Sequence, residues 1–109
     1  MNYQQRVQIA EEALAQVKSL LMSKGKDYGS DTDANANFKN TAAKLGVTPF
    51  QVWAIYVDKH QSAIANAIQR TPENPQRLAE SIEESILDVI TYHVILLTLL
   101  EDVRGQSIE

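Results

Sequence analysis

Glu80, Glu84 and Asp88 recur at intervals of four residues in the last third of the chain. On an α-helix this spacing places three carboxylates on one face, one turn apart. Carboxylates gathered in this way hold a hard cation such as Mg²⁺ or pair with lysine, whereas exposed carboxylates form an ordinary solvated face. The spacing alone leaves a metal site, a set of ion pairs and a solvated face open.

A second group of residues that could bind a ligand lies in the segment 24–29, which reads KGKDYG. Its candidate ligand-binding residues are Lys24, Lys26, Asp27 and Tyr28. Lysine ammonium groups and the N–H groups beside glycines suit a phosphate, and the tyrosine ring suits stacking on a base. The same segment is equally an ordinary helix end, where basic residues lie near the negative end of the helix dipole.

A third group combines Tyr56, Lys59 and His60 with Asn37, which lies earlier in the chain. Lys59 interrupts an apolar helix, where a lysine requires an acid or a bound anion, so we expect it to pair with the acids at 84 or 88. His60 follows an apolar stripe and is either a ligand-binding residue or a buried structural histidine. Asn37 is either a helix cap or a further ligand-binding residue.

Composition narrows the chemistry that these groups can perform. The chain has no cysteine and only two histidines, which argues against disulfides, zinc, haem and iron–sulfur sites and leaves Mg²⁺ or Mn²⁺ as candidate metals. Ten basic and fourteen acidic residues give a net charge of −4, so we expect no binding to duplex DNA or RNA. Without a signal-like start or an apolar run of membrane length, the sequence predicts a cytoplasmic protein that does not enter membranes.

Four predicted helices in a single domain, residues 1–109, position these groups. Apolar residues recur at helical spacing, and glycines and prolines fall between the periodic segments. The expected helices span about 3–24, 34–45, 49–70 and 75–104, with Gly25, Gly46 and Gly105 as stops and Pro49 and Pro75 as starts. Thr48 and Gln51 are spaced for a capping box. No segment alternates with period two, so the sequence predicts an all-α bundle of three long helices and one short helix.

The predicted helix 75–104 has two apolar faces. One stripe runs through Ile86 and Leu97. A second line, through Tyr92, Ile95 and Leu99, lies on nearly the opposite side. So small a bundle cannot easily enclose a helix that is apolar almost all round from residue 89 to 100. We therefore expect the second face to meet another copy of the chain, in a homodimer or larger homo-oligomer.

The motifs also follow a particular order along the chain, namely Lys24, Asp27-Tyr28-Gly29, Asn37-Phe38, Gly46, Lys59-His60, Glu80-Ser81, Glu84, Asp88 and Tyr92. Over about residues 20–95 this order resembles the nucleotide-modification-associated domain, a family of small phage helical proteins. That family is similar in turn to the all-α nucleoside-triphosphate pyrophosphohydrolases of the MazG and dimeric dUTPase type, which are oligomeric and bind nucleotides through Mg²⁺. The resemblance implies a nucleotide-linked role in a phage or prophage, exerted in the host cytoplasm. The residues to which it points are Lys24, Asp27, Tyr28, Asn37, Lys59, Glu80, Glu84 and Asp88.

The chain departs from the pyrophosphohydrolases in the spacing of its acids. Those enzymes carry Glu-x-x-Glu on one helix facing Glu-x-x-Asp on the next, whereas here the last helix has a spacing of four and the first has only Glu11 and Glu12. This difference in spacing argues more strongly against nucleotide hydrolysis than against nucleotide binding. We therefore favour a nucleotide-binding protein that acts in nucleotide metabolism or sequesters a host signalling nucleotide. The alternatives are a Mg²⁺-dependent nucleotide hydrolase and a non-catalytic oligomeric module.

Overall fold

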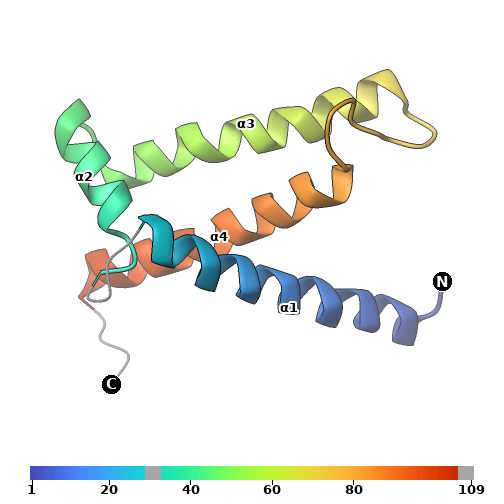
Figure 1. Ribbon diagram of the computed structural model, residues 1–109, viewed down its shortest axis with the longest axis horizontal. Coiled ribbons are helices and arrows are strands. Elements are labelled where there is room, and N and C mark those ends of the chain that lie inside the picture. The colour runs from blue at the N-terminus through green and yellow to red at the C-terminus, as the bar shows by residue number, and fades with distance from the viewer. Residues whose placement is uncertain (29–32, 106–109) are drawn as a thin grey trace.

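The computed structural model of the chain consists of four α-helices (Figure 1). They are α1 (Tyr3–Tyr28), α2 (Ala36–Leu45), α3 (Pro49–Arg70) and α4 (Ile82–Arg104). The structure describes residues 1–23 and 33–105 in full and the backbone of residues 24–28. Within these ranges no strand occurs, and the prediction of an all-α fold with three long helices and one short helix is confirmed. None of the described helices combines the length and the apolar character needed to span a membrane.

The turn between α2 and α3 forms as the sequence predicts. Gly46 ends α2 with a φ of 69°, a left-handed conformation that glycine adopts without steric cost. The Thr48 side chain accepts a hydrogen bond from the Gln51 N–H at 3.2 Å, and the Gln51 side chain accepts one from the Thr48 N–H at 2.9 Å. This capping box, with Pro49 in the first turn, sets the start of α3.

Helix α1 is longer than predicted, because it continues through Gly25 to Tyr28. A glycine inside a helix costs only about 1 kcal/mol relative to alanine, which a helix of this length can absorb. The prediction that Gly25 ends the helix is therefore wrong. The backbone of Lys24, Lys26 and Asp27 belongs to the last turns of α1 and not to a loop after it.

Helix α4 is shorter than predicted, because it begins at Ile82 and not at Pro75. Ser81 is its N-cap, and its Oγ accepts a hydrogen bond from the Glu84 N–H at 3.2 Å. Such a cap satisfies one of the first backbone N–H groups, which have no partner inside the helix. The side chain at Ser81 therefore sets the boundary that we had assigned to the proline.

The segment between α3 and α4 folds into turns. The Gln76 N–H donates to Thr71 Oγ1 at 3.1 Å, and the Arg70 guanidinium donates to the Gln76 carbonyl at 3.2 Å. These bonds tie the segment back onto the end of α3. Because α4 starts after this segment, Glu80 precedes the helix, and the prediction that three acids share one helical face is wrong.

Helix α4 occupies the middle of the fold. It packs against α3 and against α1, while α2 packs against α3 (Figure 1). Ala67 of α3 and Ser85 of α4 are completely buried, and such small side chains let two helices approach closely. The Arg77 guanidinium donates to the buried Ser85 Oγ at 2.8 Å, so this hydroxyl keeps a polar partner.

The apolar core lies where α2, α3 and α4 meet. Its buried side chains are Phe38, Ala42, Val52 and Leu99. Trp53 packs against this cluster, and its indole N–H donates to the carbonyl oxygen of Tyr92. These contacts hold α2 across the paired helices α3 and α4, and so define one end of the cleft described below.

The face of α4 that we expected at a subunit interface belongs to the chain's own core. Leu99 is buried, and Tyr92 and Ile95 pack against the same cluster. The other face carries exposed apolar side chains, with Ile86 42% and Leu97 63% exposed. The expectation that Leu99 lies at a subunit interface is therefore wrong, because Leu99 is buried in the chain's own core.

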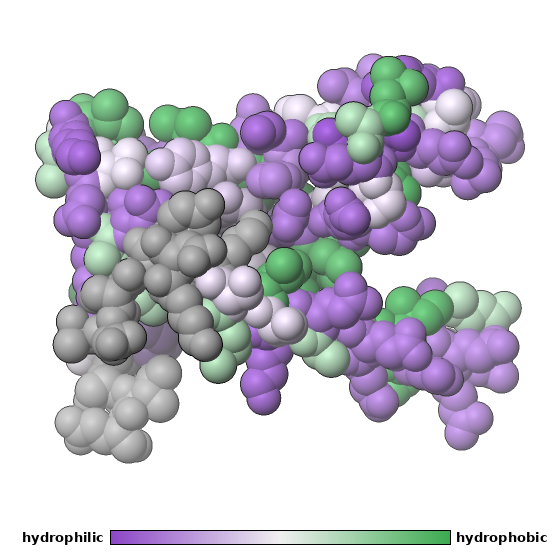
Figure 2. All heavy atoms as spheres, viewed as in Figure 1, coloured by the Kyte–Doolittle hydropathy of each residue, from purple (hydrophilic) through white to green (hydrophobic). Residues whose placement is uncertain are grey.

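The molecule has an open shape for a chain of its length. Val17 of α1 is buried, but residues 1–12 are all exposed, and the first half of α1 projects away from the other helices (Figure 2). The accessible surface is 8142 Å² and the radius of gyration is 16.0 Å. A compact chain of this mass would have about 6,000 Å² and about 13 Å. Much apolar surface is thus left uncovered by a single chain.

Candidate functional site

A cleft of about 820 Å³ runs along the seam between α3 and α4, bounded by the start of α2 and the second half of α1. Small-molecule sites have volumes of about 300–1,000 Å³. Four of the residues that the sequence analysis selected line this cleft: Asn37, Tyr56, Lys59 and His60. They come from α2 and α3, and the tertiary structure brings them to one cavity.

Aromatic rings line the cleft from three helices. Phe38 of α2 and Tyr56 of α3 lie with ring centroids 5.7 Å apart, and His60 of α3 and Tyr92 of α4 lie 5.3 Å apart. The second pair has an interplanar angle of 33°, a tilted arrangement. Rings on both sides of a cleft provide flat, polarizable surfaces, which suit a planar ring in the ligand.

Lys59 lies on the cleft wall with an exposed side chain, and among the described residues it forms no ion pair. The prediction that it pairs with the acid at 84 or 88 is wrong. Asp88 Oδ2 lies instead 3.4 Å from His60 Nδ1, and both side chains are largely buried. His60, and not Lys59, is therefore the residue of α3 that lies beside an acid of α4.

The three predicted metal ligands do not converge. Glu80 pairs with Arg77 at 2.8 Å in the segment before α4, Glu84 is exposed in the first turn of α4, and Asp88 faces His60. In the part of the chain that the structure describes, no three histidine, aspartate or glutamate side chains lie close enough to hold a metal ion. Binding of Mg²⁺ by these residues stays a prediction.

The predicted ligand-binding residues Lys24, Lys26, Asp27 and Tyr28 have side chains that lie outside the described residues. Their backbone forms the end of α1. Leu21, which lies about one turn before Lys24, lines the cleft. The end of α1 that carries these residues thus lies beside the cleft.

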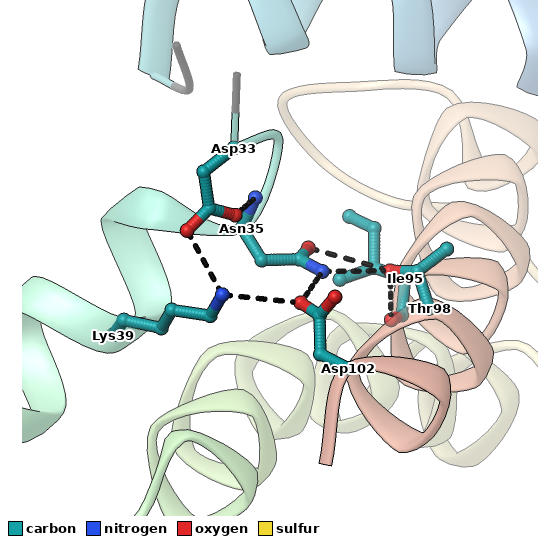
Figure 3. A network of polar contacts seen from close by, with 6 residues as sticks. All are labelled: Asp33, Asn35, Lys39, Ile95, Thr98 and Asp102. Carbon is teal, nitrogen blue, oxygen red and sulfur yellow. Dashed lines mark hydrogen bonds and ion pairs between the residues drawn. The ribbon is translucent and has the colours of Figure 1, made fainter. Parts of the chain in front are cut away.

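A polar network at one end of the cleft has no counterpart in the sequence analysis (Figure 3). At its centre is Asn35, the N-cap residue of α2, which is 6% exposed. Its Nδ2 donates to Asp102 Oδ2 at 2.8 Å and to Thr98 Oγ1 at 3.2 Å. Asn35 and Thr98 both line the cleft, so the network forms part of the wall of the site.

Two charged residues complete this network. Lys39 Nζ lies 2.8 Å from Asp33 Oδ2 and 3.3 Å from Asp102 Oδ2 (Figure 3). The hydrogen bond from Lys39 lowers the pKa of Asp33, and the same bond to Asp33 raises the pKa of Lys39. The spacings Asp33-x-Asn35 and Thr98-x-x-x-Asp102 were the available sequence signals, but neither indicates that the two segments meet.

The comparisons with known proteins leave the site itself as the basis for assigning a function. No protein-family model matches this chain, and no curated protein or solved structure matches it either.

Proposed function

We propose that this protein binds a nucleotide in the cleft between α2, α3 and α4. The observation that carries the proposal is the presence, in one cavity of about 820 Å³, of aromatic rings from three helices together with the ammonium group of Lys59. Rings stack on a base, and an ammonium group that has no ion pair among the described residues attracts a phosphate.

The dimensions of the cleft also support this ligand. Its wall on α4 extends from Thr91 to Thr98, which is bonded to Asn35. Seven residues of helix correspond to about 10 Å, which is comparable to the length of a nucleoside monophosphate from base edge to phosphate. Its lining combines the ammonium group of Lys59 with the amide of Asn35 and the hydroxyl of Thr98, groups that such a ligand can use.

The wider role of such binding rests on the family resemblance stated above. It would be phage nucleotide metabolism or the capture of a host signalling nucleotide in the cytoplasm. Hydrolysis through Mg²⁺ is the less supported alternative, because the carboxylates at 80, 84 and 88 do not converge within one chain. The mixed polar and aromatic lining favours recognition of the ligand over its chemical conversion.

We further propose that the chain acts as a homo-oligomer. Its accessible surface exceeds that of a compact chain by about 2,000 Å², which is within the range buried by obligate homodimers. The exposed apolar side chains include Val7 and Leu14 on α1 and Ile86 and Leu97 on α4. A second copy with the same surface would cover them symmetrically.

Calorimetric titration of the full chain tests the function directly. Nucleoside mono-, di- and triphosphates and cyclic nucleotides are titrated with and without Mg²⁺, and native mass spectrometry reports the assembly mass and any nucleotide that copurifies. We expect binding of at least one nucleotide. Absence of heat for all of them would contradict the proposal and favour a structural module, whereas turnover that requires Mg²⁺ would favour the hydrolase.

A matched pair of variants assigns the binding to the cleft. Tyr56→Leu removes an aromatic ring from the cleft wall while keeping apolar volume, and Tyr3→Leu makes the same change on the exposed start of α1. We expect the first variant to weaken nucleotide binding by about tenfold, the usual value of one stacking contact, and the second to leave binding unchanged. Equal affinities for the two variants would place the ligand elsewhere.

A further inference from the structure

One stripe of mostly apolar residues runs along α1 and changes its surroundings halfway. At alternating spacings of four and three residues it contains Tyr3, Val7, Ala10, Leu14, Val17 and Leu21. This alternation is the pattern of a helix that packs against another helix along its length. Near the end of the stripe Val17 is buried and Leu21 lines the cleft, in a helix that packs against α4. The second part of the stripe therefore belongs to the chain's own fold.

The first part of the stripe is left uncovered. Tyr3, Val7, Ala10 and Leu14 are all exposed, Leu14 by 57%, and the projecting arm that carries them shows apolar patches, green in Figure 2. A helix of about twelve residues is marginally stable in water without tertiary contacts, because most helical stability in proteins comes from packing of the apolar face. A partner packed on residues 3–14 would supply that stability.

The charge of this arm indicates what the partner is. Arg6, Glu11 and Glu12 are the only charged side chains in residues 1–16. Nucleic acids and acidic lipid surfaces require clustered basic residues, so neither suits this arm. A nearly neutral apolar stripe can instead pair with an identical stripe without repulsion, and the excess surface of about 2,000 Å² in one chain matches what a homodimer buries.

The position of α4 determines the direction of such pairing. A second α1 that ran parallel to the first would meet α4 where the stripe becomes buried. An antiparallel one would extend past the N-terminus, which lies away from the other helices (Figure 1). In that direction, a register centred between Val7 and Ala10 sets Tyr3 opposite Leu14 and covers all four exposed positions.

We infer that residues 3–14 of α1 pair antiparallel with the same segment of a second copy of this chain, in a two-fold contact. This inference rests on the proposed homo-oligomer and assigns the contact to a particular surface. Each copy contributes the same four positions, so the contact closes on itself.

Leu14→Glu tests the surface, with Ile9→Glu as its matched control. Ile9 is 52% exposed on the same helix but lies off the stripe. Because a broken two-fold contact separates two equal halves, we expect the mass of Leu14→Glu by light scattering to fall to about half of the wild-type value, with helical circular dichroism retained. Ile9→Glu should keep the wild-type mass. Equal masses for the two variants would overturn the inference.

Disulfide cross-linking tests the direction and register without disrupting the contact. The chain has no cysteine, so every disulfide comes from the introduced residues. Positions 3 and 14 are about 16 Å apart along one helix, too far for a disulfide, whose Cα atoms lie within about 7 Å. We expect the double variant Tyr3→Cys/Leu14→Cys to form covalent dimers on mild oxidation and each single variant to form none.

The remaining outcomes separate this inference from the proposed function. Covalent dimers in the single variants would indicate parallel pairing, and no covalent dimer in any variant would remove the contact; either result would overturn the inference. Dissociation of Leu97→Glu but not of Leu14→Glu would overturn it while supporting the homo-oligomer. A wild-type mass of 12.2 kDa would overturn both, and calorimetric titration tests nucleotide binding independently.

Discussion

Lys59 is the cation of the cleft, and its exposure decides what its removal should do. Among the described residues it has no carboxylate partner, so Lys59→Met leaves no buried acid uncompensated there. We expect the variant to unfold within about 0.5 kcal/mol of the wild type, to bind nucleotide about tenfold more weakly, and to lose part of the salt dependence of binding. Urea unfolding and calorimetry at two salt concentrations measure these effects.

Lys44→Met is the matched control for this prediction, because Lys44 is also exposed but does not line the cleft. It should keep both the affinity and the salt dependence of the wild type. A large loss of stability in Lys59→Met would instead support the hypothesis that Lys59 forms an ion pair with the acids of α4. Unchanged affinity would remove Lys59 from the site.

Asp33 and Lys39 make the polar network dependent on pH. The pKa of Asp33 is lowered from 3.8, so its contribution to stability is present above pH 3.8 and is lost as the pH falls through the lowered pKa. The pKa of Lys39 is raised from 10.5, so its contribution is present below pH 10.5 and is lost as the pH rises through the raised pKa.

Replacing the lysine should therefore flatten one part of the stability profile. In Lys39→Met we expect a smaller loss of unfolding free energy between pH 5 and pH 2 than in the wild type, because the pKa of Asp33 returns toward 3.8. Urea unfolding over this pH range measures it, with Lys18→Met as an exposed control outside the network. Superimposable profiles for the wild type and Lys39→Met would contradict the role of this ion pair.

At the scale of the elements, the start of α4 is set by Ser81. Ser81→Ala removes the hydrogen bond to the Glu84 N–H and should lower the unfolding free energy by about 1 kcal/mol. Asn74→Ala, at the residue directly before the predicted start at Pro75, should change it by less than about 0.5 kcal/mol. Chemical denaturation of both variants decides between the two starts, and the opposite ranking would favour the longer helix.

The elements also show why some residues could be selected from the sequence and others could not. Tyr56, Lys59 and His60 stand close together on one helix, so their proximity follows from local spacing. Asn35 and Thr98 are 63 residues apart, and only the packing of α2 on the α3–α4 pair brings them together. No periodicity along the chain carries that information.

At the scale of the whole molecule, the exposed apolar face of α4 predicts where copies of the chain meet. Leu97 is 63% exposed, so Leu97→Glu should leave the fold of one chain intact and dissociate the assembly. Light scattering should show the wild type above, and the variant near, the 12.2 kDa of one chain, with similar helical circular dichroism. A wild-type mass of 12.2 kDa at micromolar concentration would contradict the proposed oligomer.

Leu99→Glu provides the contrasting case on the same helix. Leu99 is buried in the core with Phe38 and Val52, so a charge there should unfold the chain instead of separating folded copies. Loss of helical circular dichroism together with aggregation would distinguish this outcome from clean dissociation. The two variants, at Leu97 and Leu99, thus distinguish the exposed face of α4 from its core face.

The sequence by itself determined the features that depend on neighbours within about four residues. Helical periodicity predicted the four helices, and the cap at Thr48 and the stop at Gly46 were predicted from their own side chains and backbone freedom. Where two helix-start signals lie close together, as at Pro75 and Ser81, the sequence alone did not decide which of them begins the helix. There the hydrogen bonds of the intervening turn favoured the later start.

The tertiary structure alone decided which apolar face of α4 is buried, which acid meets His60, and which polar groups form the wall of the cleft. Two apolar stripes on one helix are equivalent in sequence, and only the volumes and positions of the other helices distinguish them. For the same reason the regular spacing of Glu80, Glu84 and Asp88 could be recognised from the sequence. That their side chains lie apart in the folded chain could not. Distances between helices arise from packing, which no spacing along a single helix encodes.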